Sequence, residues 1–182
     1  MDASRVEPQI DASAIRAFCT IVFGFLSGPV TIRLIAETGT PDQSPQVQFT
    51  TTDRIAGRLI ELALYAARDR RAVFVVPASL KSPRAAKAGD IQETGVILVD
   101  LDDGDISAKR DHLALHLGQP SMEVASGGQT AEGQDKLHLY WKLSEAAAGA
   151  DLDRVASLRE DLALKVGGDE AREDFYSPYH TE

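Results

Sequence analysis

The sequence lacks the features of a secreted or membrane-spanning protein. Its 182 residues contain a single cysteine, Cys19, so an internal disulfide is impossible and a reducing compartment, the cytoplasm, is expected. No apolar run reaches the roughly 18 residues that cross a bilayer, so no membrane partner is expected. The first eleven residues, MDASRVEPQID, lack the basic and then apolar segments of a signal peptide.

Positive charge is also scarce. The chain has 19 Lys and Arg against 28 Asp and Glu, a formal net charge of −9. A protein that grips nucleic acid non-specifically usually presents a basic face, so this composition argues against that function. The acidic composition does not exclude a local basic groove.

The chain does have the composition of a soluble globular domain, with 43% hydrophobic and 26% charged residues. Periodicity predicts helices over 11–26, 54–69, 107–117 and 151–166, and strands over 30–35, 47–49, 72–77, 96–101, 122–125 and 137–143. Asp11 or Ser13 is expected to cap the first helix and Asp53 the second. An exposed basic loop is expected over 78–94 and a Gly-rich hairpin loop over 126–136. This order of elements, with hairpins, favours an α+β fold with a largely antiparallel sheet.

Carboxylates follow the apolar strand Val96-Ile97-Leu98-Val99. Asp100 and Asp102 are separated by one residue, so on a strand their side chains share a face. Two such carboxylates are a half-site for Mg²⁺, which fills the rest of its shell with water and phosphates. Asp103 and Asp105 lie just past the strand and fit either a supporting role or plain solvation. The alternative for the whole cluster is an acidic turn without a ligand.

A second set of polar residues surrounds His138. This histidine alternates with Leu137 and Leu139, so it faces away from them. If its face of the sheet is the one that carries Asp100 and Asp102, an imidazole and two carboxylates share one surface. Ser126, Gly127, Gly128 and Lys136 would add hydrogen-bond donors and a positive charge for a phosphate. The alternative is a histidine that merely completes the sheet.

These motifs together resemble the archaeo-eukaryotic primase superfamily, in particular its RepB-like plasmid and phage primases and primase-polymerases. The first motif is the strand that ends in Asp100-Leu101-Asp102-Asp103. The second is Ser126-Gly127-Gly128 followed by His138 on a strand, with a longer link than is usual in the family. The third is an acidic residue after a helix and a glycine pair, here Asp169.

The resemblance implies an RRM-like, largely antiparallel sheet with packed helices plus an N-terminal α/β unit. The chain 1–182 would be a single catalytic domain with an N-terminal half over 10–78 and a motif-bearing half over 95–170. Asp100, Asp102 and Asp169 would hold Mg²⁺ or Mn²⁺. The incoming nucleotide would bind to Ser126, Gly127, Gly128, Lys136 and His138.

The implied activity is template-directed nucleotidyl transfer from an NTP or dNTP in plasmid, phage or mobile-element DNA replication. The implied partners are a single-stranded DNA template and a replicative helicase or a C-terminal domain outside this chain. The basic residues that flank the first motif would contact template or triphosphate, unless they form a solvated loop: Lys81, Arg84, Lys87, Lys109 and Arg110. Arg68, Arg70 and Arg71, at the end of the second helix, are either nucleic-acid contacts or charges that favour a helix C-terminus.

Two other functions stay open. A haloacid-dehalogenase-like phosphatase also places D-x-D after an apolar strand, and it would need Ser126 at the end of a parallel strand. A non-catalytic RRM-like module would bind nucleic acid on its sheet, where Tyr140 or Trp141, but not both, would stack bases.

Overall fold

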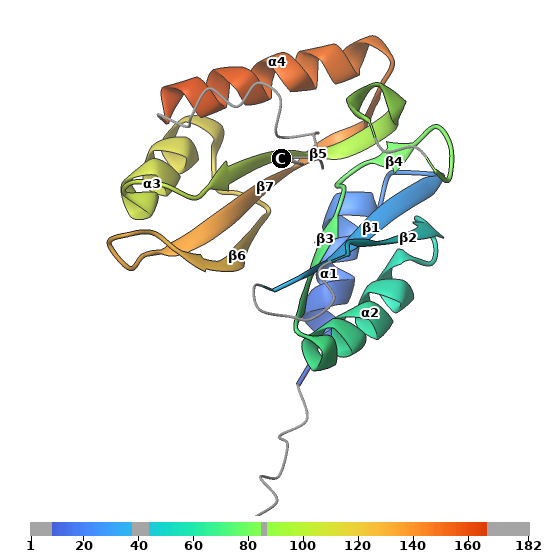
Figure 1. Ribbon diagram of the computed structural model, residues 1–182. Helices are drawn as coiled ribbons and strands as arrows, with labels where there is room; N and C mark the ends of the chain where they lie inside the picture. The colour runs from blue at the N-terminus through green and yellow to red at the C-terminus, as the bar shows by residue number, and fades with distance from the viewer. Residues whose placement is uncertain (1–8, 38–43, 85–86, 167–182) are drawn as a thin grey trace, which may run out of the picture.

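The computed structural model describes residues 9–37, 44–84 and 87–166, in which helices and strands alternate (Figure 1). The first half contains α1 (Ala12–Phe23), β1 (Pro29–Ala36), β2 (Gln46–Thr51), α2 (Ile55–Asp69), β3 (Arg71–Val75) and β4 (Ser79–Leu80). A short 3₁₀ helix (Ala88–Asp90) leads into β5 (Ile91–Leu101), α3 (Ile106–Leu117), β6 (Met122–Gln129), β7 (Asp135–Ala148) and α4 (Ala150–Lys165). None of the described helices is long and apolar enough to cross a membrane.

The described strands form two antiparallel sheets, which confirms the predicted α+β fold. The first sheet has the order β2-β1-β3, and the second has the order β4-β5-β7-β6. Every pair of neighbouring strands in these sheets is antiparallel. The second half has the element order β5-α3-β6-β7-α4, and β4 completes its four-stranded sheet next to β5.

The first sheet buries one face against α1 and α2. Val30, Ile32 and Leu34 alternate along β1 and are each fully buried in this core. Strand alternation brings the three side chains to one face, so β1 supplies the floor on which the two helices pack. Asp11 caps α1, as predicted, by accepting hydrogen bonds from the backbone N–H groups of Ser13 and Ala14.

The second sheet is covered on both faces. On one face, β5 and β7 pack against α3 and α4, through side chains that include Leu101, Leu139 and Trp141. On the opposite face, Val96 and Tyr140 belong to the same core as α1 and the first sheet. Both strands are therefore buried over their central residues, which explains their continuous apolar runs.

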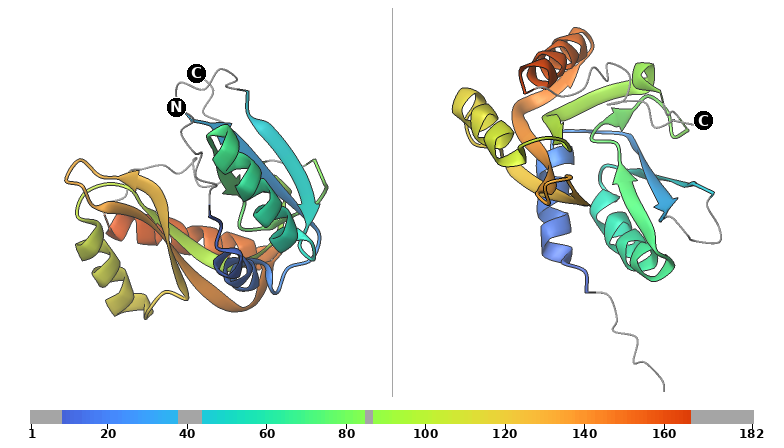
Figure 2. Two further views of the ribbon diagram at one scale, coloured as in Figure 1. Left: turned by 90° about the horizontal axis from the view of Figure 1, so that it is seen from below. Right: turned by 60° about the vertical axis from the view of Figure 1, so that its left-hand side comes forward.

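Helix α1 joins the two sheets. It contacts α2 on the side of the first sheet and β5 on the side of the second (Figure 2). The helix approaches β5 closely at Gly95, where a Cβ would lie 3.1 Å from the carbonyl oxygen of Val22. The thiol of Cys19 on α1 is buried in the core, and the burial raises its pKa to about 11. Cys19 is therefore a protonated packing residue.

Three predicted boundaries are wrong. The segment 78–94 is not one basic loop, because it contains β4, the 3₁₀ helix and the start of β5. The Gly-rich loop is shorter than 126–136, because β6 continues to Gln129 and β7 begins at Asp135. Arg54 rather than Asp53 is the N-cap of α2. A hydrogen bond with the Thr51 side chain engages the Asp53 carboxylate instead and lowers its pKa.

Candidate active site

Asp100 and His138 face each other across two neighbouring strands. The register of β5 and β7 places Asp100 directly opposite His138, and directly opposite residues share a face of the sheet. His138 Nε2 lies 3.3 Å from Asp100 Oδ1, and their side chains are 28% and 39% exposed. The structure therefore brings together the imidazole and the first of the carboxylates, on a surface that solvent can reach.

The pair borders the core that α1 shares with the second sheet. Tyr140, two residues after His138 on β7, is 5% exposed and packs edge-on against Phe18 of α1, with ring centroids 5.6 Å apart. The centroids of His138 and Tyr140 are 6.5 Å apart. Burial, and then the charge of Asp100, raises the pKa of Tyr140 to about 12. The phenol is thus a neutral, packed neighbour of the site.

The other carboxylates of the cluster differ in what engages them. Asp103 accepts a hydrogen bond from the backbone N–H of Gly104 at 2.6 Å. Asp105 is the N-cap of α3, and the hydrogen bond that it accepts from Ala108 is the main cause of its lowered pKa. Asp102 comes directly after the last residue of β5 and is exposed. Asp100 and Asp102 are therefore the two carboxylates of the cluster without a local capping role.

Ser126, Gly127 and Gly128 lie within strand β6 rather than in a loop. Ala125 pairs with Leu137 and Gln129 pairs with Asp135, so β6 carries two more residues than β7 between these points. Such an excess is a β-bulge, and Gly127 accommodates it with a φ of 86°. The residues between Gly128 and His138 therefore form the end of β6, a short turn and the start of β7.

Lys136 lies against this bulge. It precedes His138 by two residues on β7, so alternation places both on one face. A Cβ on Gly128 would be 3.0 Å from Cδ of Lys136, which shows that the lysine side chain crosses the bulge where the glycine leaves room. Lys136 and the bulge therefore lie on the same face as His138, further along the strands from its contact with Asp100, and Ser126 is exposed.

Asp100 on β5 and Asp102 just past its end are ligands of the type that a hard divalent cation prefers. Asp100 and Asp102 offer carboxylate oxygens, and Mg²⁺ uses one or two protein carboxylates together with water and phosphates. Within residues 9–37, 44–84 and 87–166, no group of three or more His, Cys, Asp or Glu side chains is placed to hold a metal ion. Asp169, the third acidic residue expected at the site, lies outside the described residues.

The basic residues near the first motif do not form one free surface. Lys81 donates to the carbonyl of Gly89 at 2.7 Å. The Arg110 guanidinium donates hydrogen bonds to both carboxylate oxygens of Glu123, with Nη2 2.7 Å from Oε1. These contacts raise the pKa of Arg110. Lys109 differs, because its Nζ lies 3.4 Å from where a Cβ on Gly104 would be. Sequence reasoning grouped these cations together, whereas the structure places Lys109 beside the acidic turn.

The geometry argues against two alternatives from the sequence, namely base stacking on Tyr140 or Trp141 and the phosphatase. Tyr140 and Trp141 are both buried, at 5% and 8% exposure, so neither offers a face on which a base can stack. The Trp141 indole donates to the carbonyl of Gly118 at 2.9 Å, which ties it to the far side of the sheet. The phosphatase reading needs Ser126 at the end of a parallel strand, but β6 pairs antiparallel with β7.

The two sheets and their helices define an α+β fold similar to that of archaeo-eukaryotic primase-polymerase (AEP) domains. A solved structure with this fold is the AEP domain (PP-N190) of the primase-polymerase (PrimPol) of cyanophage S-2L. The match has a TM-score of 0.64 and 16% sequence identity, and it covers 93% of this chain and 80% of that one. No family model matches the chain, and no curated protein matches its sequence.

Proposed function

We propose that the chain is the catalytic core of a RepB-like primase or primase-polymerase that transfers nucleotides from NTP or dNTP to a growing strand. The observation that carries this proposal is the 3.3 Å contact between Asp100 and His138 on one sheet face, which also carries Lys136 and the glycine bulge. A fold similar to a phage AEP domain supports it. Carboxylates and cations on one surface suit a substrate that arrives as a metal-bound triphosphate.

Each side chain has a role that its chemistry supports. Asp100 and Asp102, with Asp169, would hold Mg²⁺ or Mn²⁺, which when bound neutralises phosphate charge and polarises the phosphoryl oxygens. His138 and Lys136 donate hydrogen bonds to the triphosphate. The Ser126 hydroxyl and the backbone N–H groups of Gly127 and Gly128 would add further donors.

In the proposed reaction the chain positions two reactants. The 3′-hydroxyl oxygen of the growing strand attacks the α-phosphorus, the bond from that phosphorus to the bridging oxygen breaks, and pyrophosphate leaves. The hydroxyl proton passes to solvent. Asp100 holds Nε2 of His138, which fixes the imidazole ring next to the phosphates and leaves Nδ1 for a second hydrogen bond.

The proposal extends to partners and organisation. The template would be single-stranded DNA, in plasmid, phage or mobile-element replication in the cytoplasm, with a replicative helicase or a C-terminal domain outside this chain as a partner. We also propose that 1–182 acts as one unit, with its halves over 10–78 and 95–170. Support for this comes from the core in which α1 contacts residues of both halves.

Primer extension on single-stranded DNA, with Mg²⁺ or Mn²⁺ and NTP or dNTP, tests the proposal. Asp100→Asn and Asp102→Asn should each lower the rate roughly a hundredfold or more, because each removes a charge that supports the metal-bound phosphates. Asp151→Asn is the matched control, since that carboxylate pairs with Arg154 on α4 and should not affect the rate. The proposal is wrong if nucleotides bind equally well without a divalent ion, or if the chain hydrolyses a phosphomonoester instead.

A further inference from the structure

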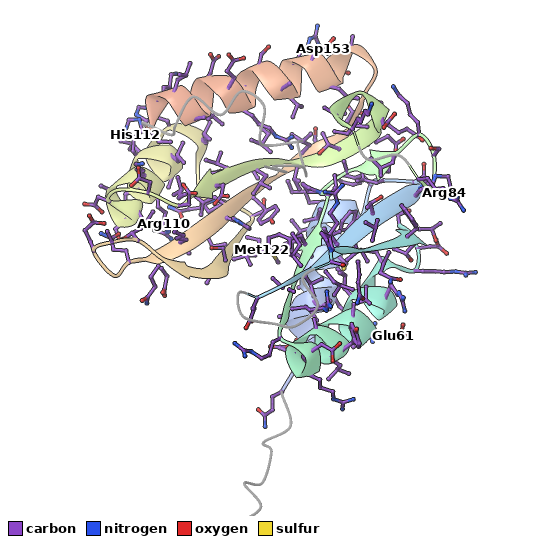
Figure 3. The ribbon with its side chains drawn as sticks, viewed as in Figure 1. Glu61, Arg84, Arg110, His112, Met122 and Asp153 are labelled. Carbon is purple, nitrogen blue, oxygen red and sulfur yellow. The ribbon has the colours of Figure 1, made fainter. Side chains whose placement is uncertain are left out.

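Two histidines lie one turn apart on α3, outside the candidate active site. The ring centroids of His112 and His116 are 4.5 Å apart, with an interplanar angle of 58°. Both residues are exposed, and Figure 3 shows His112 at the periphery of the molecule. In the described part of the chain, neither imidazole makes a hydrogen bond or an ion pair. The pair is therefore available to a ligand and has no structural role that its contacts explain.

The charges around the pair leave room for a cation. Arg110 is held by its fork onto Glu123 and by Asp111. The ammonium of Lys109 lies beside Gly104, toward the N-terminal end of the helix and away from the histidines. His116 is in the last turn of α3, where the unpaired carbonyls give the helix its negative end and favour positive charge.

The helix that carries the pair is anchored at both ends and in its middle. Near its start, the Ser107 N–H donates to the Gln134 side chain at 3.1 Å. Leu113, between the two histidines, is 1% exposed in the core. Just after its end, Gly118 accepts the hydrogen bond from Trp141. A fixed backbone reduces the entropy that a ligand must remove in order to order the two rings.

From these observations we propose that His112 and His116 form a surface site for one divalent transition-metal ion of the class that prefers imidazole, namely Zn²⁺, Ni²⁺ or Cu²⁺. Nitrogen ligands lie about 2.0–2.1 Å from such an ion, so two of them on one ion are roughly 3 Å apart. Rings with centroids 4.5 Å apart reach that spacing by side-chain rotation alone. The remaining coordination positions hold water or a donor from another molecule.

This site differs in chemistry from the one at Asp100 and Asp102. Carboxylate oxygens select hard ions such as Mg²⁺, whereas paired imidazoles select borderline ions and bind Mg²⁺ poorly. The two proposed cation sites are therefore separate, one at the end of β5 and one in the second half of α3. The inference goes beyond the proposed nucleotidyl transfer and does not depend on it.

Titration of the untagged full chain with ZnCl₂ and with NiCl₂, in millimolar Mg²⁺, tests this site. Calorimetry gives the affinity, and NMR of the histidine rings shows which imidazoles respond. The chain has four histidines, so each is replaced by glutamine in turn. His112→Gln and His116→Gln should each weaken Zn²⁺ binding about tenfold or more, because each removes one of two ligands. His138→Gln and His180→Gln are the matched controls and should leave the affinity unchanged.

The folded state of each variant is checked by circular dichroism without metal, and replacement of the exposed side chains of His112 and His116 should leave it intact. Binding that survives loss of either His112 or His116, or that requires His138 or His180, overturns the site. The site is also overturned if millimolar Zn²⁺ produces no measurable heat and no change in the NMR signals of the histidine rings. A single event per chain, lost in both α3 variants and retained in both controls, supports it.

Discussion

At the scale of single residues, the contact of Asp100 with His138 is the feature on which the proposed binding by this sheet face rests. An unpaired carboxylate would repel a triphosphate, and an unpaired imidazole would be free to rotate. Their 3.3 Å contact fixes the ring and engages one oxygen of the carboxylate. Lys136 adds a full positive charge on the same face. The residues therefore suit a substrate that brings its own cation to Asp100 and Asp102.

Replacing His138 should weaken triphosphate binding more than it affects folding. His138→Gln keeps a donor but loses the imidazole and its positive form, and a charge-assisted hydrogen bond is worth about 1.5–3 kcal/mol. The nucleotide dissociation constant, measured in Mn²⁺, should therefore rise roughly 10- to 100-fold. The thermal unfolding midpoint serves as the control and should stay near that of the native chain, because the side chain is 28% exposed. An unchanged affinity would remove His138 from the proposed site.

Tyr140 should matter through packing rather than through its hydroxyl. The ring is 5% exposed and packs edge-on against Phe18, so Tyr140→Ala should lower the free energy of unfolding by about 3–5 kcal/mol. Tyr140→Phe keeps the ring and should change the free energy of unfolding by less than about 1 kcal/mol. Urea unfolding measures both variants. A large loss in Tyr140→Phe would reveal a hydrogen bond that the described contacts do not include.

The same tyrosine predicts a pH dependence at the alkaline end. Its pKa is raised to about 12 in the folded chain, above the ordinary value of 10.0, so the folded state favours the protonated phenol. That contribution to stability is fully present below pH 10 and is lost as the pH rises toward 12. From pH 8 to pH 11 the native chain should therefore lose stability, measured by urea unfolding, relative to the Tyr140→Phe chain, which has no phenol to ionise. Equal differences between the two chains at both pH values would contradict the raised pKa.

Sequence alone could predict which residues share a strand face, but not which residues meet across strands. The two-residue alternation places Lys136 and His138 together, and it would align Asp100 with Asp102. The partner of Asp100 depends on the register of β5 against β7, which core packing on both faces sets. The neighbourhood of Lys109 and Gly104 likewise depends on how α3 begins, through the Asp105 cap.

At the scale of elements, the bulge in β6 is the feature that sequence reasoning missed. Glycine is the usual residue of turns, so Ser126-Gly127-Gly128 was expected to begin a loop. In the structure these three residues remain in strand β6. The turn is confined to the tip of the β6-β7 hairpin, where the Thr130 N–H donates to the carbonyl of Gln134. The polar start of β5, at Gln92 and Glu93, was missed for a related reason, because pairing with β4 and β7 rather than apolar alternation makes it a strand.

The bulge predicts opposite effects for two glycine substitutions. Gly127 has a φ of 86°, which a side chain disfavours, so Gly127→Ala should lower the free energy of unfolding by about 1–2 kcal/mol. Gly57 lies in α2, and a Cβ there would contact nothing within 4 Å. Gly57→Ala should therefore raise stability by about 0.4–1 kcal/mol and is the matched control. Urea unfolding measures the free energy of unfolding of both variants. An unchanged value for Gly127→Ala would mean that the bulge has another backbone conformation.

At the scale of the whole molecule, α1 makes one body of the two sheets. The pattern of Ile15, Phe18, Val22 and their neighbours predicts an amphipathic helix, but nothing in it says which sheet the helix covers. In the structure α1 contacts α2, β5 and β7, so its side chains complete two faces at once. The glycine at position 95 lets α1 approach β5 closely, since a side chain there would meet the Val22 carbonyl. Such long-range contacts leave no local periodic signal, which is why the order of elements was predictable and their junction was not.

This junction predicts that the chain unfolds in one step. Val22 is fully buried in the shared core, so Val22→Ala should lower the free energy of unfolding by about 2 kcal/mol. Trp141, the single tryptophan, lies in the other core beneath α3 and α4, and its fluorescence reports on the far side of the second sheet. If the halves unfold together, Val22→Ala shifts the urea midpoint of Trp141 fluorescence and of far-UV circular dichroism by the same amount. A Trp141 transition that stays at its native midpoint would instead show that the halves unfold independently.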